Sequence, residues 1–153
     1  VGYRQAPVTY LPARDGIPHG HVKRSNRYPN CSFFTHWTGT DGSMTWDIKV
    51  NTPGRYKAVV YYTCPEKDVG SIVRLQFKDS AIEAKVTVPH DPPLIGAKAD
   101  RFPRIESYVK DFKPMTLGTF DMAAGRGNLT LSATCCPGNS VMDVRYVVLT
   151  LLD

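Results

Sequence analysis

Short runs of alternating hydrophobic and polar residues recur along the chain from position 43 onward. The run 43–50, SMTWDIKV, places Met, Trp, Ile and Val on one face and Thr, Asp and Lys on the other. This alternation predicts a β-strand with one buried and one exposed face. Runs rich in β-branched and aromatic residues predict further strands. They cover 55–63, 71–77, 81–88, 115–122, 127–134 and 141–152.

Turn residues separate these runs, and no segment keeps a helical period beyond a turn or two. The Pro-Gly turn within 51–56 predicts that 43–50 and 55–63 pair as antiparallel neighbours. Many short strands with turn punctuation predict an all-β fold, an antiparallel β-sandwich of the jelly-roll kind. The side chains expected to fill its core are Trp46, Ile48, Tyr56, Val59, Tyr61, Ile72, Leu75, Val86, Leu117, Leu129, Leu131, Val144, Tyr146 and Val148.

The first 30 residues differ from the rest in both pattern and charge. They contain four prolines, show no periodicity, and carry five basic side chains against one acidic. We therefore predict an extended N-terminal arm or linker over 1–30 and a β-sandwich domain over 31–153. The remaining 123 residues are nearly balanced, with 14 basic and 13 acidic side chains. Such a body lacks the net basic field of a nucleic-acid-binding protein, so no nucleic-acid partner is predicted.

Length and composition fit one globular domain of 153 residues, with 42% hydrophobic and 22% charged residues. No apolar run approaches the roughly 20 residues that span a bilayer, so no membrane partner is predicted. The four cysteines contain no C-x₂-C pair and favour an oxidising compartment over a zinc site. Adjacent Cys135 and Cys136 would be strained if they bridged each other. Two interpretations remain: bridges from them to Cys31 and Cys64, or reduced thiols.

One long segment interrupts the strand pattern. Residues 86–112, VTVPHDPPLIGAKADRFPRIESYVKDF, are rich in proline and in charged side chains. Loops this long in a compact domain are usually functional. Arginine and lysine bind sulfate or carboxylate groups, and an aromatic face stacks on a sugar ring. The candidate ligand-binding residues here are His90, Asp91, Asp100, Arg101, Arg104, Tyr108 and Lys110. The structural alternative is that Asp91, Asp100 and Asp111 pair with these cations to hold the loop in place.

Three candidates lie outside this segment. Trp37, before a turn in FFTHWTGTDG, is predicted to be an exposed stacking platform, whereas Trp46 alternates with aliphatic residues and belongs to the core. If Tyr61 points into the core, Tyr62 points out of it. Lys67, with Asp68, then borders the same surface as the long loop.

Several motifs together resemble the C-terminal accessory domain of secreted bacterial sulfatases, of the arylsulfatase and N-acetylgalactosamine-6-sulfatase type. The residues that carry the resemblance lie within 33–152 and read W-D-x-x-V-x-x-P-G-R-Y, Y-Y-T-C-P-x-x-D-x-G-S, H-D-P-P-L, D-R-x-P-R, Y-V-K-D-F and VMDVRYVVLTLL. The strand–turn–strand element is also similar to galactose-binding-like β-sandwich carbohydrate-binding modules. The resemblance implies a secreted or periplasmic location and a sulfatase catalytic domain in the same polypeptide.

The catalytic machinery of a sulfatase is missing. None of the four cysteines begins the C-x-P-x-R motif from which the sulfatase aldehyde forms. The nucleophile elbow G-x-S-x-G is absent too. We therefore predict that the chain is not an enzyme.

The sequence predicts a non-catalytic carbohydrate-binding module that recognises a polysaccharide, sulfated or uronic, and targets an attached enzyme to it. The alternatives are a structural accessory domain that packs on a sulfatase catalytic domain, and a glycan-acting enzyme. No cofactor is predicted. The resemblance to sugar-binding sandwiches admits a structural Ca²⁺ at Asp143, with a surface pair between Asp143 and Arg145 as the alternative.

Overall fold

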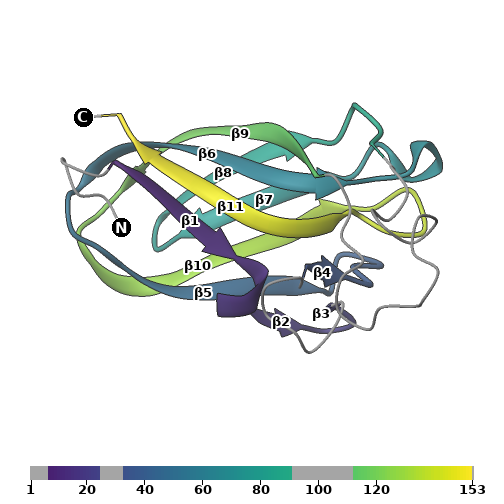
Figure 1. Cartoon of the computed structure of the whole chain (residues 1–153), viewed down its shortest axis with the longest axis horizontal. Coiled ribbons are helices and arrows are strands. Elements are labelled where there is room, and N and C mark those ends of the chain that lie inside the picture. Colours follow the sequence, from purple (N-terminus) through teal and green to yellow (C-terminus); the bar gives the residue numbers. More distant parts are fainter. Residues whose placement is uncertain (1–6, 25–32, 91–111, 153) are drawn as a thin grey trace, which may run out of the picture.

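The computed structural model describes residues 7–24, 33–90 and 112–152 (Figure 1). Their elements are strands and two short 3₁₀ turns, η1 (Ala13–Asp15) and η3 (Glu66–Asp68). The strands are β1 (Val8–Pro12), β2 (Ile17–His19), β3 (Lys23–Arg24), β4 (Phe34–Thr35), β5 (Ser43–Val50), β6 (Gly54–Thr63), β7 (Ile72–Phe77), β8 (Ser80–Lys85), β9 (Lys113–Met122), β10 (Gly125–Cys135) and β11 (Asp143–Leu151). None of the described elements is a helix long and apolar enough to cross a bilayer.

The strands form two antiparallel sheets packed face to face, which confirms the predicted β-sandwich. The five-stranded sheet has the order β2-β5-β10-β7-β8. The six-stranded sheet has the order β3-β4-β11-β6-β9, and β1 also pairs with β11. In Figure 1, β1 runs alongside β11 with β6 and β9 above them, β7 and β8 of the other sheet overlap these strands in the view, and β10 and β5 lie below.

The Pro-Gly turn does not make a hairpin, so the predicted pairing of 43–50 with 55–63 is wrong. β5 belongs to the five-stranded sheet and β6 to the six-stranded sheet. The turn at 51–53 carries the chain from one layer to the other. Both strands expose an alternating face, so their sequences alone do not distinguish pairing within a sheet from stacking across the core.

The part of the first 30 residues that the structure describes packs on the sandwich as strands of its two sheets, and the predicted domain boundary at 30 stays a prediction. β1 pairs along β11 from Val8 to Pro12, and β2 pairs with β5. Between them the chain crosses the side of the sandwich: the indole N–H of Trp46 donates to the carbonyl oxygen of Pro12 at 3.0 Å. Gly16 is required there, because a Cβ would lie 2.9 Å from the rings of Phe34 and Trp46.

The core fills the space between the sheets with side chains from alternating positions. Ten of the fourteen expected core residues are buried: Trp46, Ile48, Tyr56, Leu75, Val86, Leu117, Leu129, Leu131, Val144 and Val148. Of these, Val148 is buried but lies on the outer face of its sheet, where it pairs with Tyr10 of β1. The other four, Val59, Tyr61, Ile72 and Tyr146, are only half-buried. In β6 the buried positions are Tyr56, Ala58, Val60, Tyr62 and, at its end, Thr63. The strand alternates with period two from Tyr56 to Tyr62, so the assignment of Val59 and Tyr61 to the core is in the wrong phase.

Candidate functional site

The two outward-facing surfaces of the sandwich differ sharply in chemistry. The outer face of the five-stranded sheet is polar, with hydroxyl residues such as Thr45 and Thr130 paired across its centre. On its margin the Arg126 guanidinium donates to both carboxylate oxygens of Asp47 at 3.1 and 2.7 Å. This pairing holds the pKa of Asp47 below its ordinary value. A polar face of this kind is the ordinary solvated side of an antiparallel sheet.

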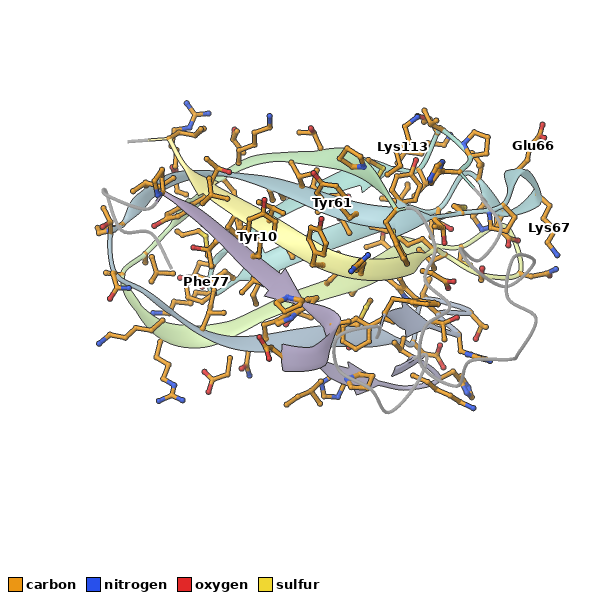
Figure 2. All side chains as sticks on the ribbon, in the orientation of Figure 1. Tyr10, Tyr61, Glu66, Lys67, Phe77 and Lys113 are labelled. Carbon is orange, nitrogen blue, oxygen red and sulfur yellow. The ribbon has the colours of Figure 1, made fainter. Side chains whose placement is uncertain are left out.

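The outer face of the six-stranded sheet instead carries a row of three tyrosines, one from each of three neighbouring strands. We call Tyr10 of β1, Tyr146 of β11 and Tyr61 of β6 the tyrosine row. The ring centres of Tyr10 and Tyr146 lie 5.4 Å apart, and those of Tyr61 and Tyr146 lie 4.6 Å apart. Figure 2 shows Tyr10 and Tyr61 over the middle of this sheet. The row is therefore continuous across the strands.

Strand register places these rings together. Tyr146 lies directly opposite Tyr61, and Tyr10 lies opposite Val148, two residues beyond Tyr146. A β-bulge at Arg145 shifts the register between β11 and β6 at this point. A bulge changes which side chains face outward and increases local twist. It brings Tyr146 onto the outer face in line with Tyr61.

The tyrosine row is apolar at its base and accessible at its top. Tyr10 is 60% exposed, and Val8 on the same strand is 45% exposed. Val148 lies on this outer face yet is only 8% exposed, because the neighbouring side chains cover it. Burial raises the pKa of the Tyr146 phenol, as does the neighbouring Tyr61, while Arg145 opposes the shift. This contiguous aromatic patch makes the outer face of the six-stranded sheet the candidate binding site.

Cationic side chains border the row. Arg145 precedes Tyr146, and Lys57 lies two residues before Val59 on the exposed side of β6. Lys113, at the start of β9, is not part of this group: it pairs with the inward-facing Tyr62, whereas the next residue, Pro114, pairs with Tyr61. Lys57 is exposed, and Arg145 is half-buried. The site thus combines stacking rings with positive charge.

A second group of candidate residues lies at one end of the sandwich, in the loops after β6 and β8. Lys67 is exposed on η3 (Figure 2), as predicted, but the carboxylate of Asp68 is buried. It accepts hydrogen bonds from the backbone N–H of Asn139 at 2.9 Å and from the Ser140 hydroxyl at 3.2 Å. Asp68 therefore joins two loops and does not border the surface.

His90 is held at this same end through its backbone. Its N–H and carbonyl group form a reciprocal pair with those of Cys64, at 2.8 and 2.7 Å. The Tyr62 hydroxyl also donates to the carbonyl oxygen of Val88 at 2.5 Å. The start of the segment 86–112 is thus fastened to the end of β6, about where Lys67 projects.

Two predicted surface aromatics are buried, and those predictions are wrong. Trp37 is 1% exposed, and its carbonyl oxygen accepts a hydrogen bond from the N–H of Val141 at 2.7 Å. Its ring packs near Gly42, where an added Cβ would approach it to 3.2 Å. Tyr62 is also 1% exposed, because β6 alternates from Tyr56 and so turns Tyr62 inward. Neither ring is available to stack on a sugar.

The remaining ligand candidates lie outside the described residues. They are Asp91, Asp100, Arg101, Arg104, Tyr108 and Lys110. Their roles stay predictions.

The described residues also bear on the predicted metal site and on the cysteines. No group of three or more His, Cys, Asp and Glu side chains there is placed to hold a metal ion. Asp143 is half-buried at the start of β11, opposite Thr63, and a Ca²⁺ site at Asp143 stays a prediction. Cys135 is exposed and Cys136 half-buried, and both are free thiols.

Sequence reasoning missed the tyrosine row. It assigned Tyr10 to an arm and Tyr61 and Tyr146 to the core. The signal was present in β6: if Tyr56 faces inward, a period of two turns Tyr62 inward and Tyr61 outward. No comparable signal exists for Tyr146, because the bulge at Arg145 breaks the alternation of β11.

Known structures share this fold. The chain superposes on the family 35 carbohydrate-binding module from Clostridium thermocellum with a TM-score of 0.60 at 12% identity, covering 94% of this chain and 98% of that one. It superposes on the module CBM6cm-2 of Cellvibrio mixtus lichenase 5A, solved in complex with cellotriose, with a TM-score of 0.60 at 7% identity, covering 95% and 98%.

A larger enzyme also contains a matching part. The Podospora anserina GH26-CBM35 β-(1,4)-mannanase matches with a TM-score of 0.61 at 17% identity, over 94% of this chain. The chain spans 27% of the length of that enzyme. No protein-family profile matches the sequence, and no curated protein matches it significantly. At these identities the likeness establishes the fold alone.

Proposed function

We propose that the chain is a non-catalytic carbohydrate-binding module whose tyrosine row binds a polysaccharide. The observation that carries the proposal is the contact between three tyrosine rings on an open sheet face. The fold it shares with carbohydrate-binding modules of families 35 and 6 supports the same function.

Tyrosine suits this task physically. Its ring is a rigid apolar surface that stacks on the C–H face of a pyranose, and its hydroxyl bonds sugar hydroxyl groups. Few rotatable bonds are fixed on binding, so little conformational entropy is lost. Tyr61 and Tyr146 restrain each other before the sugar arrives. The site is thereby organised in advance for stacking.

The cations around the row favour an acidic glycan. Arg145 and Lys57 place positive charge on the face that carries the rings, and guanidinium and ammonium groups bind sulfate or carboxylate. We extend the proposal to a sulfated or uronic polysaccharide. In this proposal Arg101 and Arg104, the cations predicted from the sequence, also bind acidic groups of the glycan.

The proposed role is to hold an attached enzyme at its polymer in a secreted or periplasmic setting. Tethering raises the local concentration of catalyst without any chemistry in the module itself. The sequence motifs that resemble a sulfatase accessory domain identify a sulfatase as the proposed enzyme.

Affinity electrophoresis of the chain in gels containing chondroitin sulfate, alginate or neutral galactomannan tests this function. We expect retardation by an acidic polysaccharide, and retardation that weakens as salt rises. Tyr10→Ala removes the most exposed ring and should weaken affinity about tenfold, as loss of a binding anchor does. Thr130→Ala, on the opposite sheet, is the matched control and should bind as the unaltered chain does.

Two other outcomes would replace the proposal. If no gel retards the chain, the exposed row instead serves as an interface for an adjoining domain, as a structural accessory domain requires. Release of sugar products by the chain alone would make it a glycan-acting enzyme.

A further inference from the structure

Building on the proposed function, we infer that the tyrosine row takes an internal segment of a single polysaccharide chain. The chain lies across the strands, from β1 toward β9. The site is not built for the terminus of a chain or for the flat surface of a crystalline polymer.

The direction follows from the order of the strands. Tyr10, Tyr146 and Tyr61 come from β1, β11 and β6, which are consecutive in the sheet. On the next strand, β9, Pro114 lies opposite Tyr61 and is exposed. The row thus crosses the strands obliquely, because Tyr10 is offset by two residues from Tyr146, and it continues onto a fourth strand.

Both ends of the row are accessible. Tyr10 lies on β1 at the margin of the sheet and is 60% exposed. Pro114, at the other end, is exposed too. A site for a chain terminus needs a wall against which the last sugar ends, whereas the exposure of these two residues lets a linear chain continue past both as far as residues 7–24, 33–90 and 112–152 are concerned.

The three rings form one continuous apolar strip. Their centres are 5.4 and 4.6 Å apart, so neighbouring rings pack against one another, because rings lying side by side in one plane would need a wider separation. One sugar can stack on the exposed ring of Tyr10 while the following sugars contact the outer edges of Tyr146 and Tyr61. Occupying one ring alone would leave most of the apolar contact unused.

The tilt of the rings decides between a single chain and a flat polymer surface. The planes of Tyr10 and Tyr146 differ by 54°, and those of Tyr61 and Tyr146 by 34°. A flat crystalline face would stack on only one of these planes. A single chain turns at each glycosidic bond and can present successive sugars to differently tilted rings.

Isothermal titration of the 153-residue chain with chondroitin sulfate and alginate oligosaccharides of increasing length tests the inference. We expect at least tenfold tighter binding by hexasaccharides than by disaccharides, with no further gain from longer chains. Borohydride reduction of the terminal sugar of an octasaccharide should leave its affinity unchanged, and sedimentation with microcrystalline cellulose or chitin should not deplete the protein.

The role of the row is tested by Tyr10→Ala. It should weaken hexasaccharide binding severalfold more than disaccharide binding, because a disaccharide can still occupy Tyr146 and Tyr61. Thr130→Ala should change neither.

Equal affinity for disaccharides and hexasaccharides, loss of affinity on terminal reduction, or depletion by a crystalline polymer would each overturn the inference while leaving the proposed function in place. Failure to bind any of these oligosaccharides or the parent polysaccharides would instead overturn the proposed function, and the inference with it.

Discussion

The buried carboxylate of Asp68 accepts a 2.9 Å hydrogen bond from the backbone N–H of Asn139, 71 residues further along the chain. Its second oxygen accepts from the Ser140 hydroxyl. The two loops meet so closely that a Cβ on Gly138 would lie 2.7 Å from the Cα of Asp68. This junction fixes one end of the sandwich, where Lys67 and His90 also lie.

Asp68→Ala should lower the free energy of unfolding by about 1–3 kcal/mol, because it removes the charged acceptor of the hydrogen bonds from Asn139 and Ser140. Urea denaturation followed by circular dichroism measures the change. Asp68→Asn is the matched variant: its amide oxygen can still accept from Asn139, so we expect a smaller loss. Equal stability of all three proteins would show that the junction contributes nothing.

The buried tyrosines predict a loss of stability at alkaline pH. Burial raises the pKa of Tyr56 and Tyr62, and it raises the pKa of Tyr146 as well. A phenol whose pKa is higher in the folded state stabilises that state fully below the pKa of the unfolded chain, near 10. That contribution is lost as pH rises through the folded value.

Urea midpoints measured from pH 8 to pH 11 check this expectation. We expect these phenols to leave the urea midpoint nearly unchanged up to about pH 9 and to lower it above about pH 10. Lysines also lose charge in this range, so Tyr62→Phe is the control. It should flatten the alkaline fall, and at pH 8 it should cost about 1 kcal/mol for the lost hydrogen bond to Val88. An identical pH profile for both proteins would contradict the assignment.

Tryptophan fluorescence tests the burial of Trp37. Trp37 and Trp46 are the two tryptophans of the chain, and they are 1% and 2% exposed. Their emission should resist quenching by acrylamide, because both rings are buried. Titration with a glycan that the protein binds should leave the emission unchanged, because the tyrosine row contains no tryptophan. Strong quenching by a glycan would restore Trp37 as the stacking platform.

The sequence predicts much of the fold because each strand can be recognised from its own pattern of hydrophobic and polar residues. The alternation of 43–50 depends on nearest neighbours, and β5 has those bounds in the structure. Pairing is different: whether 43–50 lies beside 55–63 or across the core from it depends on residues far away. The Pro-Gly turn is compatible with both, and the structure has the second arrangement.

The candidate site was less predictable for a related reason. It is assembled from three strands that are distant in sequence, and one of them comes from the stretch expected to be an arm. The bulge at Arg145 is visible only in the register between β11 and β6. The exposure of Lys67 follows from its place in a loop and needs no register, whereas the inward or outward direction of Tyr61 does; the role of Lys67 in binding stays a prediction.

The adjacent residues Tyr61 and Tyr62 separate binding from stability. Tyr61 is half-buried in the tyrosine row, whereas Tyr62 is 1% exposed in the core. Tyr62→Ala should lower the free energy of unfolding by about 3–5 kcal/mol, as removal of a buried aromatic side chain does. Tyr61→Ala should cost only about 1 kcal/mol, the scale of one aromatic contact.

Glycan affinity should respond in the opposite order. In affinity gels that contain the retained polysaccharide, Tyr61→Ala should weaken binding about tenfold, because an anchor of the row is gone. The folded fraction of Tyr62→Ala, which circular dichroism quantifies, should bind with nearly unchanged affinity, since its side chain faces the other way. If Tyr62→Ala folds well and loses the glycan while Tyr61→Ala keeps it, then the sugar does not bind the outer face of β6, and the site must lie elsewhere on the sandwich.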